Sequence, residues 1–160
     1  TYTDLETVYK ESDIISLHCP LTPDNVHMIN SKSIALMKQG VMIINTGRGK
    51  LIDTPDLIDG LKSGKVGSAG LDVYEEETDY FFEDFSSSTI TDDILARLLT
   101  FPNVLITSHQ AFFTREALDN IVQVTLDNIK GFFKNGELPN EICYKCTDSL
   151  CRRKEEGNCF

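Results

Sequence analysis

Short runs of apolar residues alternate along the chain with segments of helical periodicity. Residues 14–19, 41–44, 66–73 and 104–107 are the apolar runs, each bounded by glycine, proline or small polar residues, as is typical of buried strands. Helices are predicted before, between and after these strands, over residues 3–11, 30–37, 54–63, 92–99 and 114–135. This alternation predicts an α/β fold with a parallel sheet and crossover helices. Because the strand runs are continuous, we expect both faces of the sheet to be buried.

Capping residues mark the predicted helix boundaries. Thr3 with Glu6 has the spacing of a capping box, and Thr54 followed by Pro55 predicts the start of another helix. Thr114 precedes the longest helix, which Asn135-Gly136 should end. One face of that helix carries its apolar residues: Leu118, Ile121, Val122, Leu126, Ile129, Phe132 and Phe133.

Charge and composition exclude several classes of partner. The formal net charge is −10, whereas nucleic acids and anionic membranes require clustered cations. No apolar run approaches the length of a membrane span, and no signal peptide is evident. We therefore expect a cytoplasmic protein with no nucleic-acid or membrane partner. Because the chain opens at Thr1 with a helix and no preceding strand, we also expect it to be a piece of a longer protein.

Charged side chains follow three of the predicted strands. Arg48 comes after the second strand between two glycines, Asp72 and Glu77 come after the third, and His109 after the fourth. Parallel strands end at one edge of the sheet, so these side chains can converge there. Arg48 could bind a substrate carboxylate through two hydrogen bonds, and His109 could transfer a proton. A carboxylate such as Glu77 could orient the imidazole and favour its protonated form.

Less specific interpretations of the same residues remain open. Arg48 could be a surface residue in a solvated loop, and His109 could simply cap a turn. Glu77 is one of three consecutive glutamates. Spacing alone does not decide between these interpretations and an acid/base site.

Four blocks of sequence resemble the D-isomer-specific 2-hydroxyacid dehydrogenases. These blocks are Ser12 to Thr22, Asn45 to Asp53 with its central arginine, Gly70 to Glu77, and Ser108 to Ala111. They occur in the family's order, and the similarity extends from residue 1 to about 141. The aromatic segment 80–85 and Phe112-Phe113 are most similar to the D-lactate dehydrogenase branch.

The resemblance implies a role for each matching residue. Arg48 would bind the carboxylate of pyruvate or D-lactate, His109 would be the acid/base, and Glu77 would pair with His109. Phe112 would lie near the substrate methyl group. The cofactor implied is NAD, with its contacts at Cys19, Pro20, Asn25, Thr46, Gly47, Arg48 and Asp72. Asp72 would approach the nicotinamide carboxamide. Asn25 as a mere turn residue and Phe112 as a core residue are the alternatives.

The resemblance also implies a domain division. Residues 1–112 would form the C-terminal part of a Rossmann-type, doubly wound NAD-binding domain, and 113–142 the helix that returns to the substrate domain. Nothing in the sequence matches the glycine-rich G-x-G-x-x-G fingerprint that holds the pyrophosphate, so we expect that element upstream of Thr1. The chain alone should therefore be unstable or inactive, and the whole protein a homo-oligomer.

Residues 143–160 form a cysteine-rich tail that departs from the family pattern. Cys143, Cys146, Cys151 and Cys159 could bind Zn²⁺ as thiolates, but their spacing is irregular. We predict free thiols and no metal, with the zinc site as the alternative.

The function that follows is NAD-dependent reduction of pyruvate to D-lactate. Another short 2-oxo acid or glyoxylate could be the substrate. A different class of function is an NAD(H)-sensing interaction protein, as some relatives are, although the sequence shows no basic or disordered segment for binding a partner. A non-functional gene fragment is the third possibility.

Overall fold

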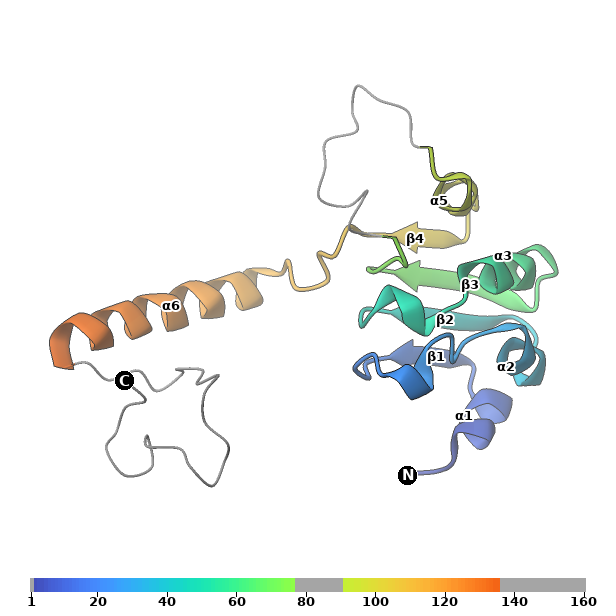
Figure 1. Ribbon diagram of the computed structural model, residues 1–160, viewed down its shortest axis with the longest axis horizontal. Helices are drawn as coiled ribbons and strands as arrows, with labels where there is room; N and C mark the ends of the chain where they lie inside the picture. The colour runs from blue at the N-terminus through green and yellow to red at the C-terminus, as the bar shows by residue number, and fades with distance from the viewer. Residues whose placement is uncertain (1, 77–90, 136–160) are drawn as a thin grey trace. The chain divides into compact units, whose positions relative to one another are not determined.

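The computed structural model describes residues 2–76 and 91–135 of the chain (Figure 1). The chain divides into two compact units, Thr1–Ala111 and Phe112–Phe160, which are described separately. The first unit contains a sheet of four parallel strands in the order β1-β2-β3-β4. The strands are β1 (Ile14–Leu17), β2 (Val41–Asn45), β3 (Val66–Leu71) and β4 (Val104–Ile106). The predicted α/β fold with a parallel sheet is confirmed.

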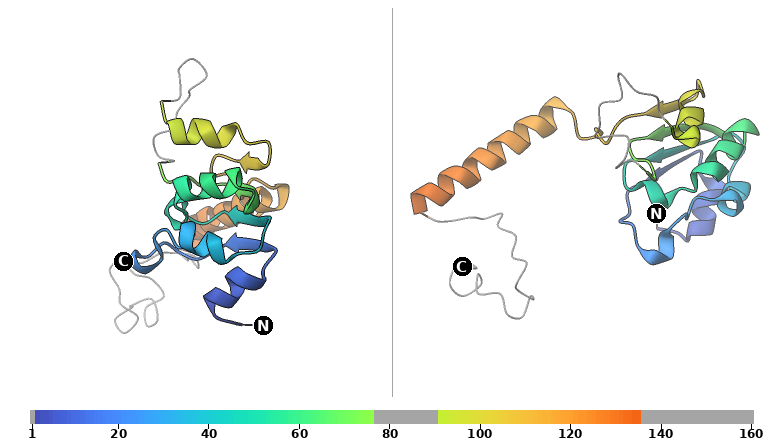
Figure 2. Two further views of the ribbon diagram at one scale, coloured as in Figure 1. Left: turned by 90° about the vertical axis from the view of Figure 1, so that its right-hand side faces the viewer. Right: turned by 45° about the horizontal axis from the view of Figure 1, so that its top comes forward.

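Helices connect the strands as the sequence predicts. They are α1 (Leu5–Glu11), α2 (Ser31–Leu36), α3 (Thr54–Lys62) and α5 (Asp93–Leu99), with short 3₁₀ turns η1 (Pro23–Asn25) and η2 (Gly49–Leu51). Helices α2, α3 and α5 cover one face of the sheet (Figure 2). Ile43, Leu57 and Leu98 are fully buried between them, so the core lies on this side.

Two helix caps differ from the prediction by one residue. Asp4 rather than Thr3 caps α1, because its extended backbone lets the carboxylate accept a hydrogen bond from Thr7 N at 2.8 Å. Asp53 rather than Thr54 caps α3 and accepts from Asp56 N at 3.1 Å. Thr54 is then the first residue of the helix, and its hydroxyl group bonds elsewhere.

The expectation that both faces of the sheet are buried is wrong for the described part of the first unit. Side chains alternate between buried and exposed along β1 and β2. On the face opposite the helices, Ile14 is 58% exposed, Met42 38% and Leu105 67%. The residue runs are apolar on both faces, but the described helices of this unit cover only one of them.

The second unit contains α6 (Arg115–Asn135), which begins after Thr114 as predicted. The Thr114 hydroxyl oxygen accepts a hydrogen bond from Ala117 N at 3.2 Å. Ile121, Val122 and Phe132 on its apolar face are more than half exposed. In the described part of the chain, no helix, α6 included, is both long enough and apolar enough to cross a membrane.

Candidate active site at the carboxyl edge of the sheet

The four strands end in register, which defines one edge of the sheet. Leu17 pairs with Asn45, Asn45 with Leu71, and Leu71 with Ile106, so the last residues of the strands form a single row. The segments that carry the predicted site residues leave from this row. Because neighbouring strands lie about 4.8 Å apart, the ends of β2 and β4 are separated by roughly 10 Å. That span suits a small organic substrate held from both sides.

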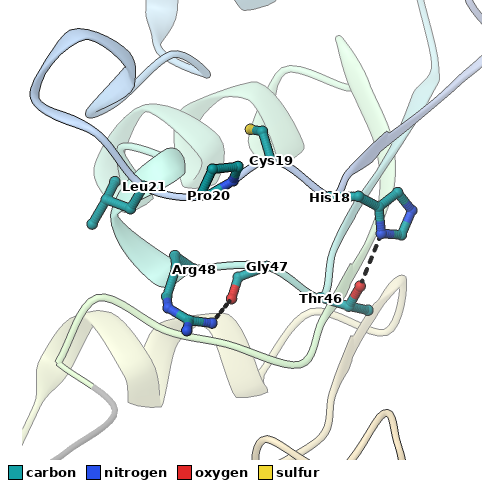
Figure 3. A pocket seen from close by; sticks show the side chains of 7 residues that line it. All are labelled: His18, Cys19, Pro20, Leu21, Thr46, Gly47 and Arg48. Carbon is teal, nitrogen blue, oxygen red and sulfur yellow. Dashed lines mark hydrogen bonds between the residues drawn. The ribbon is translucent and has the colours of Figure 1, made fainter. Parts of the chain in front are cut away.

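A buried asparagine shapes the turn that carries Arg48. Asn45 is 1% exposed, its amide oxygen accepts from Gly47 N at 3.0 Å, and its amide nitrogen donates to Arg48 O at 2.9 Å. The side chain thus closes the turn in place of a backbone ladder. The guanidinium of Arg48 is exposed and donates to Gly47 O at 2.7 Å (Figure 3). Asn45 is not among the predicted site residues, although an asparagine between a strand and a glycine turn is a recognisable local signal.

Two segments face each other across a hollow of about 690 Å³. Figure 3 shows the segment after β1 on one side and the turn after β2 on the other. The lining residues are His18, Cys19, Pro20, Leu21, Thr46, Gly47 and Arg48. Five of the predicted cofactor contacts, Cys19, Pro20, Thr46, Gly47 and Arg48, are therefore brought together.

Asn25 stabilises its own loop. Its amide nitrogen donates to Pro20 O at 2.8 Å, and its oxygen accepts from Thr22 N at 2.7 Å. These hydrogen bonds agree with the alternative interpretation of Asn25 as a turn residue. A contact between Asn25 and the cofactor stays a prediction.

Asp72 holds the turn that carries His109. Its side chain is 5% exposed, and its two oxygens accept from Gln110 N at 2.7 Å, from Ala111 N at 2.9 Å and from the Thr107 hydroxyl group. The backbone continues the connection, because His109 N donates to Asp72 O at 2.8 Å. Such a carboxylate, surrounded by donors, fixes the end of β4 against the end of β3.

His109 adopts a left-handed backbone conformation with φ of 52°. This conformation is uncommon for a residue other than glycine and persists only where the surroundings enforce it. The bonds from Asp72 supply that enforcement. His109 is half-buried, so its imidazole is neither sealed in the core nor free in solvent.

Two predicted site residues cannot be placed beside this edge. Glu77 lies outside the described residues. Phe112 belongs to the second unit, where it is 52% exposed, and its role stays a prediction.

Glu75, two residues before Glu77, has partners that the sequence did not suggest. Its oxygen Oε1 accepts from the backbone nitrogen and the hydroxyl group of Thr54, both at 2.9 Å. Its Oε2 lies 3.2 Å from Nε2 of His27, whose Nδ1 lies 3.4 Å from Asp53 Oδ2. No sequence pattern links these residues, because His27 and Glu75 are 48 positions apart.

Tyr74 connects β3 to the start of α5. Its hydroxyl group donates to Asp92 Oδ2 at 2.7 Å, while Asp92 Oδ1 caps α5 through Ile94 N and Leu95 N. Burial of the ring, and then the bond to Asp92, raises the pKa of Tyr74 far above its ordinary value. The phenol therefore stays protonated and keeps donating.

The described residues contain no cluster of side chains suited to bind a metal ion. Among residues 2–76 and 91–135, no three His, Cys, Asp or Glu side chains are grouped to hold an ion. The cysteines of the tail lie outside the described residues, so the zinc site remains an alternative based on the sequence alone.

Known proteins match the chain closely over most of its length. The family model described as D-isomer specific 2-hydroxyacid dehydrogenase, NAD binding domain, matches residues 1–111. A D-lactate dehydrogenase of Escherichia coli (strain K12) is 54% identical over 141 residues, which cover 88% of this chain and 43% of the relative. An aromatic 2-oxoacid reductase of Clostridium sporogenes (strain ATCC 7955) is 53% identical over 143 residues, covering 89% of this chain and 43% of the relative.

A solved structure shares the fold as well. The crystal structure of D-lactate dehydrogenase with NAD⁺ from Lactobacillus jensenii superimposes with a TM-score of 0.81 at 36% identity, covering 89% of this chain and 43% of that one. The chain thus spans about two fifths of the length of these relatives.

Proposed function

We propose that this chain, which belongs to the family of D-isomer-specific 2-hydroxyacid dehydrogenases, carries the catalytic residues of an NAD-dependent enzyme that reduces pyruvate to D-lactate. The observation that carries the proposal is the common edge of the strands. The Arg48 turn leaves the end of β2, and the His109 turn is bound to Asp72 at the end of β3. In the proposed enzyme, the anion-binding fork of Arg48 and the acid/base group of His109 would act from this one edge of the sheet.

The residues lining the hollow fit the nicotinamide end of NAD. The turn at Gly47 packs against the segment after β1, since a Cβ there would meet Cys19 O and Leu51 Cδ1 at 3.4 Å, in ordinary van der Waals contact. Cys19, Pro20 and Thr46 beside it have compact side chains. We assign Cys19, Pro20, Thr46 and Gly47 to this end. NADH, when bound, supplies the hydride for reduction of the substrate carbonyl. The glycine-rich element that holds a pyrophosphate is absent from this sequence.

Arg48 would bind the substrate through its carboxylate. The guanidinium forms two parallel hydrogen bonds to a carboxylate, and its charge also polarises the adjacent carbonyl group. For this, Nη1 must exchange its bond with Gly47 O for one with the substrate. Because the guanidinium is exposed, that exchange requires no rearrangement of the core.

His109 would transfer the proton. In reduction, its imidazole donates a proton to the carbonyl oxygen, and in oxidation it removes the proton from the hydroxyl group. Asp72 fixes the backbone turn that carries the imidazole by accepting hydrogen bonds from Gln110 N and Ala111 N. Glu77 would favour the protonated imidazole, as the family resemblance implies.

A larger 2-oxo acid is the second candidate substrate, because one relative of 53% identity is named an aromatic 2-oxoacid reductase. The family resemblance implies that Phe112 lies near the substrate methyl group, where it would favour pyruvate over such a substrate. We also propose a cytoplasmic homo-oligomer for the whole protein, as expected from the sequence.

The test is turnover by the protein expressed from its complete gene. NADH oxidation is followed with pyruvate, phenylpyruvate and glyoxylate, and the chirality of the product is determined. We expect pyruvate to give D-lactate at the highest kcat/KM. His109→Gln should lower kcat by about 10²–10⁴-fold, as loss of a general acid does. Lys50→Gln, an exposed neighbour of Arg48, is the matched control. Tight NADH binding without turnover of any 2-oxo acid would favour the NAD(H)-sensing function instead.

A further inference from the structure

Among the described residues, two other than glycine adopt left-handed backbone conformations, and both are histidines. One is His109 in the candidate site, and the other is His27, with φ of 51°. A backbone of this kind is maintained only by strong local contacts. The peptide groups of His27 have them: its N donates to Lys50 O at 2.8 Å, and its O accepts from Asn30 Nδ2 at 2.7 Å.

The imidazole of His27 connects two other segments. Nδ1 lies 3.4 Å from Asp53 at the start of α3, and Nε2 lies 3.2 Å from Glu75 after β3. Glu75 is bound in turn to Thr54 through two hydrogen bonds. We call His27, Asp53, Thr54 and Glu75 the clasp. The Glu75 side chain is 18% exposed, so water screens these contacts only in part.

The clasp reaches Arg48 through a contact between backbones. A Cβ on Gly49 would lie 2.1 Å from Tyr74 O and 2.5 Å from Glu75 N, which means that the peptide after Arg48 rests directly on the peptide before Glu75. The segment from Arg48 to Thr54, which includes the buried Leu51 and Ile52, also links the Arg48 turn to the clasp along the chain. Moving Glu75 would therefore move the surface on which the Arg48 turn lies.

Charge explains why the clasp needs a histidine. Asp53, Glu75 and Glu76 line a small cavity together with His27, so three acidic side chains share its wall. An ionised carboxylate only accepts hydrogen bonds, whereas a histidine ring places one nitrogen toward each carboxylate and donates from one nitrogen when neutral and from both when protonated. Without the ring, Asp53 and Glu75 would face each other as like charges.

We propose that His27 is a positioning residue that holds the Arg48 turn in place through Glu75 and the peptide before it. This inference rests on the proposed function for its effect on catalysis, but not for the mechanical connection. His27 itself makes no described contact with the Arg48 side chain. Its loss should weaken binding of the 2-oxo acid while the nicotinamide end of the site keeps its own residues.

Hydrogen exchange tests the connection whether or not the enzyme turns over. In the protein expressed from its complete gene, the amides of Leu51 and Ile52, which donate to Arg48 O and Gly49 O, should exchange faster in His27→Ala than in wild type. Lys32→Ala, at an exposed position on α2, is the control and should change nothing. His27→Gln, which retains a donor, should give an intermediate rate and serves if His27→Ala does not fold. Unchanged exchange at Leu51 and Ile52 in these His27 variants would overturn the proposal.

Kinetics then separates positioning from a general loss of structure. His27→Ala should raise KM for pyruvate by about tenfold to a hundredfold, as a small misplacement of a binding group does. The Kd of NADH should stay within error of wild type. A parallel loss of NADH binding, or an unchanged KM despite faster exchange, would refute the positioning role. If wild type reduces no 2-oxo acid while the exchange rates respond, the proposed function fails and the connection to Arg48 is supported.

Discussion

Asp72→Asn is the most informative single substitution in the candidate site. The exchange preserves size and removes one charge from a carboxylate that is 5% exposed. In the folded protein Oδ1 accepts from Gln110 N and Thr107, and Oδ2 accepts from Ala111 N. An asparagine keeps one oxygen but turns an NH₂ group toward a donor.

The magnitude follows from those bonds. The best orientation of the substituted amide would keep its oxygen at the Oδ1 position and leave the backbone N–H of Ala111 facing another donor. Losing one hydrogen bond to a charged group costs about 1.5–3 kcal/mol. Since 1.4 kcal/mol is a factor of ten, the ratio of folded to unfolded protein should fall by roughly 10- to 150-fold.

The effect on activity distinguishes two roles for Asp72. If the carboxylate positions the His109 turn, kcat should fall by about tenfold to a hundredfold, because a displacement of the acid/base group by about 1 Å has that effect. The Kd of NADH should then be nearly unchanged. If Asp72 instead bonds the nicotinamide carboxamide, as the family resemblance implies, the Kd of NADH should rise.

The assays are urea unfolding followed by circular dichroism, NADH titration and steady-state kinetics on the protein expressed from its complete gene. Thr107→Val removes one donor and leaves the charge, so it should cost less than Asp72→Asn. Asp59→Asn is the surface control, because the Asp59 side chain is 75% exposed. An Asp72→Asn variant within about 0.5 kcal/mol of wild type, the range of ordinary surface substitutions, would refute the reasoning.

Three further substitutions test other parts of the structure by urea unfolding. Tyr74→Phe should lower the free energy of unfolding, because it removes the hydrogen bond to Asp92. Since the pKa of Tyr74 is raised in the folded protein, wild type should be more stable than the variant below pH 10.0, and this difference should shrink as the pH rises toward the folded pKa. A difference between wild type and variant that does not change with pH would contradict the prediction. Leu57→Ala, at a side chain with 0% exposure, should cost about 2–5 kcal/mol, and a cost near zero would show that this part of the core is not packed as described. Asn30→Ala should cost about 0.5–2 kcal/mol, because Asn30 caps α2 through Lys32 N and Ser33 N, whereas Ser31→Ala should not.

The strands and most helix boundaries could be predicted because their signals are local. Val41–Asn45 is an apolar run closed by a turn, and Thr114 precedes a long amphipathic helix. The caps at Asp4 and Asp53 were missed by one residue because Thr, Asp and Asn serve the same function. The backbone geometry that chooses between adjacent candidates is not visible in the sequence.

Long-range features of the site could not be predicted. The sequence indicated that Arg48 and His109 lie at one edge, because parallel strands share their direction. It did not indicate the bond between Glu75 and Thr54, which depends on how α3 packs against the segment after β3. The exposure of Ile14 and Leu105 was missed for a related reason: an apolar run shows that a face can be buried, not what covers it.

The bond between Tyr74 and Asp92 has a consequence for how this protein can vary. It joins two residues that are 18 positions apart, so the two ends of the interval between them are held together. The energetic effect of changing the length of such an interval is small, since each doubling of a closed loop costs only about 0.6 kcal/mol. Changes of length between Glu77 and Asp92 should therefore cost little while Tyr74, α5 and the Asp72 turn keep their geometry.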